Sequence, residues 1–236
     1  MGSSVVELRE ALARQYPGAL PLVYRTAPAV QTGLERLDRL LPSGGIPRGR
    51  VTVWVPGGGA TAVLRSACRS VLGQGERAAW VDGDRTLAGD AWPEGAVLVR
   101  PVTAESACGC AEELLRSGGF ALVVLMIEAL RLERVAARLG RAVREGGGGF
   151  VAVSGVTTLA HLRITSRIAV EETVWRKNPF GEPASIDAVV LRIDAHSLGW
   201  SGRTVVRLPV RGRGGRVGLD PLVDRRGRKG DRRGRV

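Results

Sequence analysis

A glycine-rich segment near the start of the chain has residue types that could bind phosphate. It reads Val55-Pro56-Gly57-Gly58-Gly59-Ala60-Thr61-Ala62, and between a strand and a helix its backbone N–H groups could converge on an anion. A working phosphate loop also needs a Lys for the β- and γ-phosphates and a hydroxyl for magnesium. Thr61 supplies a hydroxyl, but both lysines of the chain, Lys177 and Lys229, lie far along the sequence. We interpret the three glycines and Thr61 as a vestigial phosphate loop without a cofactor, and ATP binding is the alternative.

Other residues that could support catalysis or metal binding are scattered. His161 and His196 are far apart and have no nearby cysteine. Cys108 and Cys110 lie two residues apart in a helical pattern, so they point to different helix faces. Together with Cys68 the chain has three cysteines, which fit neither a disulfide framework nor a structural zinc site. This cysteine usage favours a cytoplasmic protein. We expect no metal site and no catalytic residues.

Positive charge gathers at the C-terminus. The net charge is +12, of which +9 falls in residues 203–236. Such a segment can neutralise the phosphates of DNA without reading sequence. A solubilising tail, or one that binds an acidic protein, is an equal alternative. The candidate contacts in the tail are Arg225, Arg226, Arg228, Lys229, Arg232 and Arg233.

Capping signals predict two helices before the glycine segment. Ser4 with Glu7 forms a capping box, and an apolar stripe follows, made of Val5, Leu8 and Leu12. This stripe could dock on a partner protein or fold back onto the core. Apolar runs in the chain are short, so no membrane contact is expected. Thr32 with Glu35 forms the second capping box.

From residue 31 the pattern alternates between strands and helices, as in an α/β fold with a mainly parallel sheet flanked by helices. We expect strands at 51–55, 78–81, 96–99, 121–126 and 150–154, and helices at about 61–72, 104–116 and 132–144. Segments 167–174, 186–193 and 204–210 alternate apolar and polar residues, as half-exposed antiparallel strands do. The domain organisation is thus 1–30, a helix and linker; 31–210, the core; and 211–236, the Arg-rich tail.

One expected loop combines cations with aromatic rings. It reads Trp175-Arg176-Lys177-Asn178-Pro179-Phe180, and Trp175, Arg176 and Lys177 are candidates for contact with nucleic acid or protein. An ordinary turn, with both aromatic rings at the edge of the core, is the simpler interpretation.

Several segments in order resemble the bacterial RecA-type recombinase core, a P-loop NTPase-type fold. These are Thr32-Gly33-Leu34-Glu35-Arg36-Leu37-Asp38, then Gly44-Gly45-Ile46-Pro47-Arg48-Gly49-Arg50, then Ala79-Trp80-Val81-Asp82-Gly83-Asp84, then Ser117-Gly118-Gly119-Phe120-Ala121-Leu122-Val123-Val124. The resemblance covers roughly residues 30–210. It implies a RecA-like core in which Asp84 takes the place of the water-activating glutamate; a turn residue is the simpler interpretation of Asp84.

The departures from this family remove the parts that handle ATP. Where the family has its loop lysine, this chain has Ala62 or a neighbour, and where a strand should end in the magnesium-associated aspartate, it reads Leu125-Met126-Ile127. An apolar side chain cannot hold hydrated magnesium. Room for the two DNA-contacting loops of the family is also missing, so strand exchange is not expected.

A short, degenerate RecA-like chain with an Arg-rich end is similar to the ImuA family of inducible-mutagenesis proteins. The similarity implies a non-catalytic accessory factor of the SOS response. Its implied partners are a RecA-type filament, an ImuB-type polymerase homologue and an alternative replicative polymerase, with non-specific DNA contact through the tail. The alternatives are a SulA-type cell-division inhibitor, a DNA-dependent ATPase with an atypical phosphate loop, and a plain nucleic-acid binder.

Overall fold

The computed structural model of the chain describes residues 29–87, 95–155 and 160–210. Its helices are α2 (Glu35–Leu40), α3 (Ala60–Gly73), α4 (Ala104–Arg116), α5 (Ala129–Gly146) and the 3₁₀ helix η3 (Val170–Glu172). Its strands are β1 (Ala29–Val30), β2 (Ile46–Pro47), β3 (Val51–Val55), β4 (Ala78–Asp82), β5 (Val97–Val99), β6 (Leu122–Met126), β7 (Gly149–Val153), β8 (Leu162–Ile168), β9 (Val174–Lys177), β10 (Pro183–Ser197) and β11 (Trp200–Pro209).

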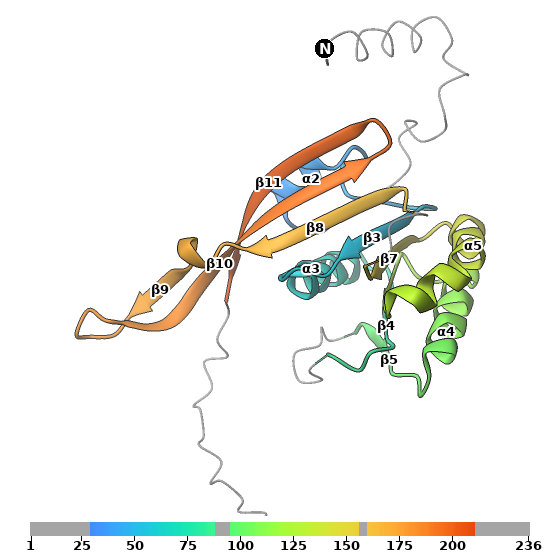
Figure 1. Cartoon of the computed structure of the whole chain (residues 1–236), viewed down its shortest axis with the longest axis horizontal. Helices are drawn as coiled ribbons and strands as arrows, with labels where there is room; N and C mark the ends of the chain where they lie inside the picture. The colour runs from blue at the N-terminus through green and yellow to red at the C-terminus, as the bar shows by residue number, and fades with distance from the viewer. Residues whose placement is uncertain (1–28, 88–94, 156–159, 211–236) are drawn as a thin grey trace, which may run out of the picture.

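A nine-stranded sheet organises the described part of the chain (Figure 1). The strands follow the order β11-β10-β8-β3-β7-β6-β4-β5, and β9 pairs with β10 outside this path. Neighbours from β8 to β5 are parallel, whereas β10 is antiparallel to β8, β9 and β11. The predicted mixed α/β fold, with a mostly parallel central sheet flanked by helices, is confirmed.

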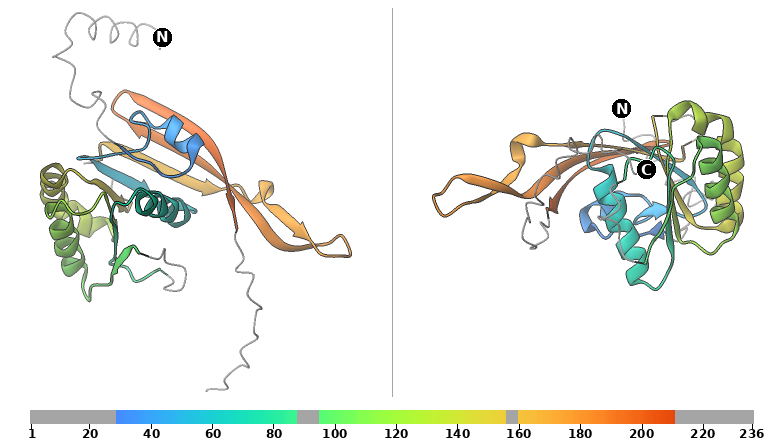
Figure 2. Two further views of the ribbon diagram at one scale, coloured as in Figure 1. Left: turned by 180° about the vertical axis from the view of Figure 1, so that it is seen from behind. Right: turned by 90° about the horizontal axis from the view of Figure 1, so that it is seen from below.

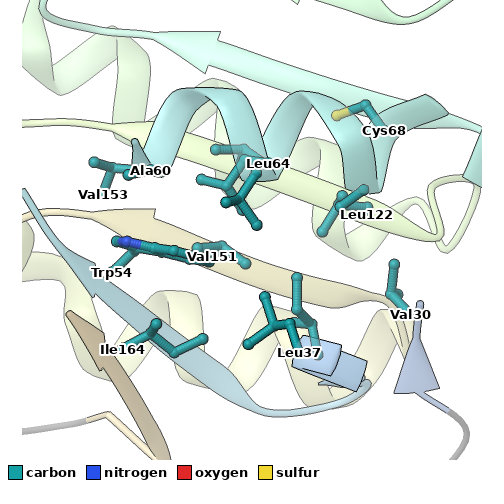
Figure 3. Packing of buried hydrophobic residues seen from close by; sticks show 14 of the residues in the cluster. Val30, Leu37, Trp54, Ala60, Leu64, Cys68, Leu122, Val151, Val153 and Ile164 are labelled. Carbon is teal, nitrogen blue, oxygen red and sulfur yellow. The ribbon is translucent and has the colours of Figure 1, made fainter. Parts of the chain in front are cut away.

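Helices cover both faces of the parallel strands (Figure 2). On one face, Trp54 and Ile164 of the sheet pack with Leu37 of α2 and Leu64 of α3 (Figure 3). On the other face, Val53 belongs to a cluster with residues of α4 and α5. Successive side chains of a strand point to opposite faces, so β3 is buried on both sides and its apolar run has a direct cause.

Helix α5 is longer than its predicted range of 132–144, because it begins at Ala129 and continues to Gly146 in the glycine run. Its C-cap residue Gly147 has φ +69°, and the Gly147 N–H donates to the Val143 carbonyl at 3.0 Å. This left-handed residue ends the helix in the usual way. None of the helices in the described ranges is both long enough and apolar enough to cross a membrane.

The strand predicted at 167–174 is misplaced. Strand β8 begins at Leu162 and ends at Ile168, and it runs parallel to β3 and antiparallel to β10. Its alternation starts earlier than the sequence suggested, since Leu162 and Ile164 are buried while Arg163 between them is exposed. The connection from β7 to β8 is correspondingly shorter.

Residues predicted as a loop form strand β9 of a projecting hairpin, the β9–β10 arm (residues 174–188). Trp175, Arg176 and Lys177 all lie on β9, with Trp175 opposite Ile186. The bend comes later, because the Asn178 Oδ1 accepts hydrogen bonds from the N–H groups of Phe180 and Glu182 at 2.9 and 3.0 Å. The aromatic rings do not cap the core: Trp175 is 51% exposed and Phe180 is 86% exposed.

The capping box predicted between Thr32 and Glu35 is replaced by a different contact. The buried Thr32 donates from both its N–H and its Oγ1 to the Asp38 Oδ1, each at 2.8 Å. Helix α2 begins at Glu35, whose carboxylate pairs with the exposed Arg39. The start of α2 is therefore fixed by Asp38, one turn further along than the motif suggested.

We predict that Asp38→Ala destabilises the fold far more than Glu35→Ala. Removing Asp38 leaves two buried donors of Thr32 unsatisfied, at a cost of about 1–3 kcal/mol. Removing Glu35 breaks one exposed ion pair, worth about 0–0.5 kcal/mol. Urea unfolding followed by circular dichroism measures both; equal losses would restore the capping-box interpretation.

Candidate functional site

The glycine turn opens onto a pocket of about 370 Å³ at the carboxyl edge of the parallel sheet. Residues 56–59 connect β3 to α3, and Thr61 lies in the first turn of α3. The other walls are Asp84 and Thr86 after β4, residues 126–128 at the end of β6, and Ser154 and Gly155 after β7. Carboxyl ends of parallel strands meet at one edge, so Thr61 and Asp84, which are distant in sequence, line the same pocket.

The three glycines of the turn are held in close contact with β8 and β10. A Cβ on Gly57 would lie 2.5 Å from the Ser166 carbonyl oxygen, and one on Gly59 would lie 2.5 Å from the Leu191 Cδ2. Gly59 also has φ +80°, a region that side chains with a Cβ rarely adopt. Glycine is thus required here by the packing of the protein on itself, with or without a ligand.

A short hydrogen-bond chain fixes the turn from the β8 side. The Trp54 Nε1 donates to the Ser166 Oγ at 3.0 Å, and the Ser166 hydroxyl donates to the Gly58 carbonyl oxygen at 2.6 Å. Trp54 is fully buried and Ser166 is nearly so. The Trp54 Nε1, the Ser166 Oγ and the Gly58 carbonyl oxygen each have a hydrogen-bond partner in this series. The two bonds therefore join the turn to the core.

The charge in the pocket is negative. Among the described residues that line it, the ionisable side chains are Asp84 and Glu128, and no Lys or Arg is present. Desolvation raises the pKa of Asp84 above its ordinary value, and the negative charges of Asp82 and Glu128 raise it further. The carboxylates of Asp84 and Glu128 would repel a phosphate group that entered the pocket. The hydroxyls of Thr61, Thr86 and Ser154 carry no charge, so they cannot offset this repulsion.

Met126 occupies the end of β6, where the family pattern has an aspartate. It is half-buried and lines the pocket, and the Thr86 hydroxyl lies 3.8 Å from its sulfur. A thioether is a poor ligand for magnesium, which takes oxygen ligands. No group of three or more His, Cys, Asp or Glu in the described part of the chain could hold a metal ion.

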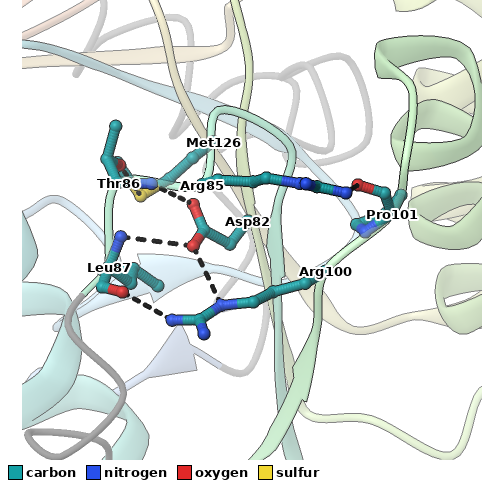
Figure 4. Close-up of polar contacts among 7 residues, drawn as sticks. All are labelled: Asp82, Arg85, Thr86, Leu87, Arg100, Pro101 and Met126. Atoms are coloured by element: carbon teal, nitrogen blue, oxygen red, sulfur yellow. Dashed lines mark hydrogen bonds and ion pairs between the residues drawn. The ribbon is translucent and has the colours of Figure 1, made fainter. Parts of the chain in front are cut away.

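Asp82 is the carboxylate that sequence analysis overlooked (Figure 4). It is fully buried at the end of β4, and its oxygens accept the N–H groups of Thr86 at 3.0 Å and Leu87 at 3.2 Å. The Arg100 Nε lies 3.4 Å from the Asp82 Oδ2. Asp82 therefore shapes the turn, and Asp84 is left exposed at the pocket. An aspartate followed by glycine at a strand end is a turn signal that could have revealed this role.

Among the remaining candidates, those that the structure describes do not line the pocket. Trp175, Arg176 and Lys177 are on the β9–β10 arm, where Arg176 pairs with Asp187 at 2.9 Å. The N-terminal stripe and the basic tail fall outside the described residues. Those candidates are Val5, Leu8, Leu12, Arg225, Arg226, Arg228, Lys229, Arg232 and Arg233.

We predict that Gly59→Ala destabilises the fold by about 1–3 kcal/mol, through backbone strain and the collision with Leu191. The matched control is Gly73→Ala at the end of α3, where a Cβ meets nothing within 4 Å. That variant should be neutral or more stable by up to about 1 kcal/mol. Thermal and urea unfolding compare the two, and wild-type stability of Gly59→Ala would refute the packing role of this glycine.

Comparison with known proteins gives no match, either to a protein-family model or to a curated protein sequence. The function is therefore inferred from the residues of the pocket, the β9–β10 arm and the surface of the sheet.

Proposed function

We propose that the protein is a non-catalytic, RecA-like accessory factor in the response to DNA damage. In this role it is an adaptor in translesion synthesis that contacts a RecA-type filament or an ImuB-type polymerase subunit. The observation that carries the proposal is the pocket at the glycine turn: it has the position of a nucleotide site, yet its charged side chains are Asp84 and Glu128.

The local architecture supports the RecA-like part of the proposal. The buried strand β3 leads into the glycine turn and then into α3, the strand–turn–helix context that a phosphate loop requires. Asp84 and the end of β6 lie around the same pocket, as the resemblance to the RecA-type core implies. Together with the motifs in the sequence, this placement favours descent from a nucleotide-binding core.

The chemistry of the pocket supports the non-catalytic part. ATP hydrolysis requires a cation at the phosphates and an oxygen ligand for magnesium. The pocket offers Met126 in place of the ligand and two carboxylates in place of the cation. In this proposal the core acts through its shape and its docking surfaces, because the described lining of the pocket has neither the cation nor the magnesium ligand that a nucleotide cycle requires.

The β9–β10 arm supplies a surface suited to protein contact. Trp175 and Phe180 are 51% and 86% exposed, and Ile186, opposite Trp175, is 38% exposed. Tryptophan is among the residues that most often dominate the free energy of protein binding. We therefore place the adaptor contact on the arm.

We expect no binding of ATP. Isothermal titration of the full chain with ATP and magnesium should give no heat of binding at micromolar protein, because no cation lines the described wall of the pocket. Micromolar affinity that is lost in Thr61→Ala would favour the alternative, an ATPase with an atypical phosphate loop.

We expect the double variant Trp175→Ala/Phe180→Ala to lose binding to its partner at least tenfold, since aromatic anchors typically contribute about 2 kcal/mol or more each. Val102→Ala is the matched control, because Val102 is 84% exposed but lies between β5 and α4. Co-purification and filament-assembly assays with a RecA-type protein and an ImuB-type subunit provide the measurement.

Absence of any contact with both proteins would refute the proposal. Binding to the tubulin-like division protein instead, with filamentous cells on overexpression, would establish the SulA-type alternative.

A further inference from the structure

One face of the sheet extension formed by β8, β10 and β11, the open face, is covered by none of the helices in the described part of the chain. On the opposite face, Ile164, Leu191, Ile193 and Val206 are buried in the cluster that includes α2 and α3. Side chains at the intervening positions point the other way, and helices α4 and α5 cover the neighbouring strands instead. Figure 1 shows this open face toward the viewer, with α2 behind it.

The open face is rich in arginine. The strand registers Arg163↔His196, Arg167↔Arg192, Asp194↔Arg203 and Val190↔Arg207 place these residues side by side on it. It thus carries five arginines and one aspartate. All five belong to three adjacent strands, so their charges act together on anything that lies across the sheet.

Three of these arginines have no acidic partner among the described residues. Arg192 pairs with Glu171 at 3.1 Å and with Glu172, and Arg203 pairs with Asp194. The exposed residues Arg163, Arg167 and Arg207 have no such pair within the described ranges. Their guanidinium groups are available to an external anion.

We propose that this open face binds the phosphate backbone of single-stranded nucleic acid, through Arg163, Arg167 and Arg207. Protein–protein interfaces are depleted of charge at their centre, whereas five arginines are spread over this face among Thr165, Val190 and Val205, and interfaces with nucleic acid are polar and positive. Planar guanidinium groups suit phosphate oxygens.

The geometry matches an extended strand better than a duplex. Arg163 and Arg167 are four residues apart on β8, about 13 Å, and β11 lies two strands, about 10 Å, from β8. The flat face offers no element that could enter a duplex groove. The β9–β10 arm next to it could do so, but it is a poor candidate, because its residues 174–188 have no net positive charge: Glu182 and Asp187 balance Arg176 and Lys177. Since the described residues of the face include no Phe, Tyr or Trp on which bases could stack, binding should be independent of base sequence.

Fluorescence anisotropy of a labelled 20-nucleotide thymidine strand tests the proposal with the full chain. The variant Arg163→Gln/Arg167→Gln/Arg207→Gln should bind roughly tenfold more weakly, and the slope of log affinity against log salt should fall by about 2. The matched control is Arg134→Gln/Arg141→Gln/Arg144→Gln, which removes the same charge from the exposed side of α5. This control should change affinity less than twofold.

The outcomes separate the open face from the tail and from the adaptor role. Equal weakening in both variants would overturn the proposal, since net charge would then explain binding, and unchanged affinity in both would overturn it as well, since the tail would then explain binding. An equal loss of affinity for a 20-base-pair duplex, or for a polyglutamate peptide of matched charge, would also overturn it. The assay contains no partner protein, so its result is independent of the contacts proposed for the arm. Circular dichroism confirms that both variants are folded.

Discussion

The close approach of β8 and β10 to the glycine turn is the constraint on which the arrangement of this protein depends. Gly57 lies against the backbone of Ser166, and Gly59 lies against Leu191, at distances that leave no room for a Cβ. The Ser166 hydroxyl then ties the turn to Trp54. These contacts join the loop that would hold phosphate to the strands that carry the arm and the open face, so that all three candidate surfaces rest on one rigid junction.

Much of the core could be predicted from the sequence, because buried parallel strands are apolar throughout. Strand β3 and helix α4 have the predicted bounds. Helix α4 was well marked, since Thr103 caps it by accepting the N–H of Ser106 at 3.1 Å. The sheet extension was harder to place: in β8 the buried residues alternate with arginines, and a single exposed arginine looks the same in a strand and in a loop.

The candidate site was predicted in part. The missing lysine and Met126 are visible in the sequence, whereas the negative charge of the pocket depends on Glu128, which the fold brings beside Asp84. Residue type alone does not separate the roles of Asp82 and Asp84, because the fold buries Asp82 and exposes Asp84; the local signal is Gly83, which follows Asp82. The β9–β10 arm was not predicted from the sequence. The position of its bend depends on the hydrogen bonds of the Asn178 side chain, and its aromatic residues favoured a turn packed against the core.

Strand β11 is ten residues long and, within the described part of the chain, pairs with β10 alone. A long unpaired edge is where sheets of separate molecules join and aggregate. Arg203 and Arg207 put positive charge along this edge, and Pro209 at its end has no N–H to donate to a second sheet. The arginines that make the open face attractive to anions therefore also oppose self-association, because the edges of two molecules repel each other. High salt screens this repulsion and should favour aggregation at the β11 edge.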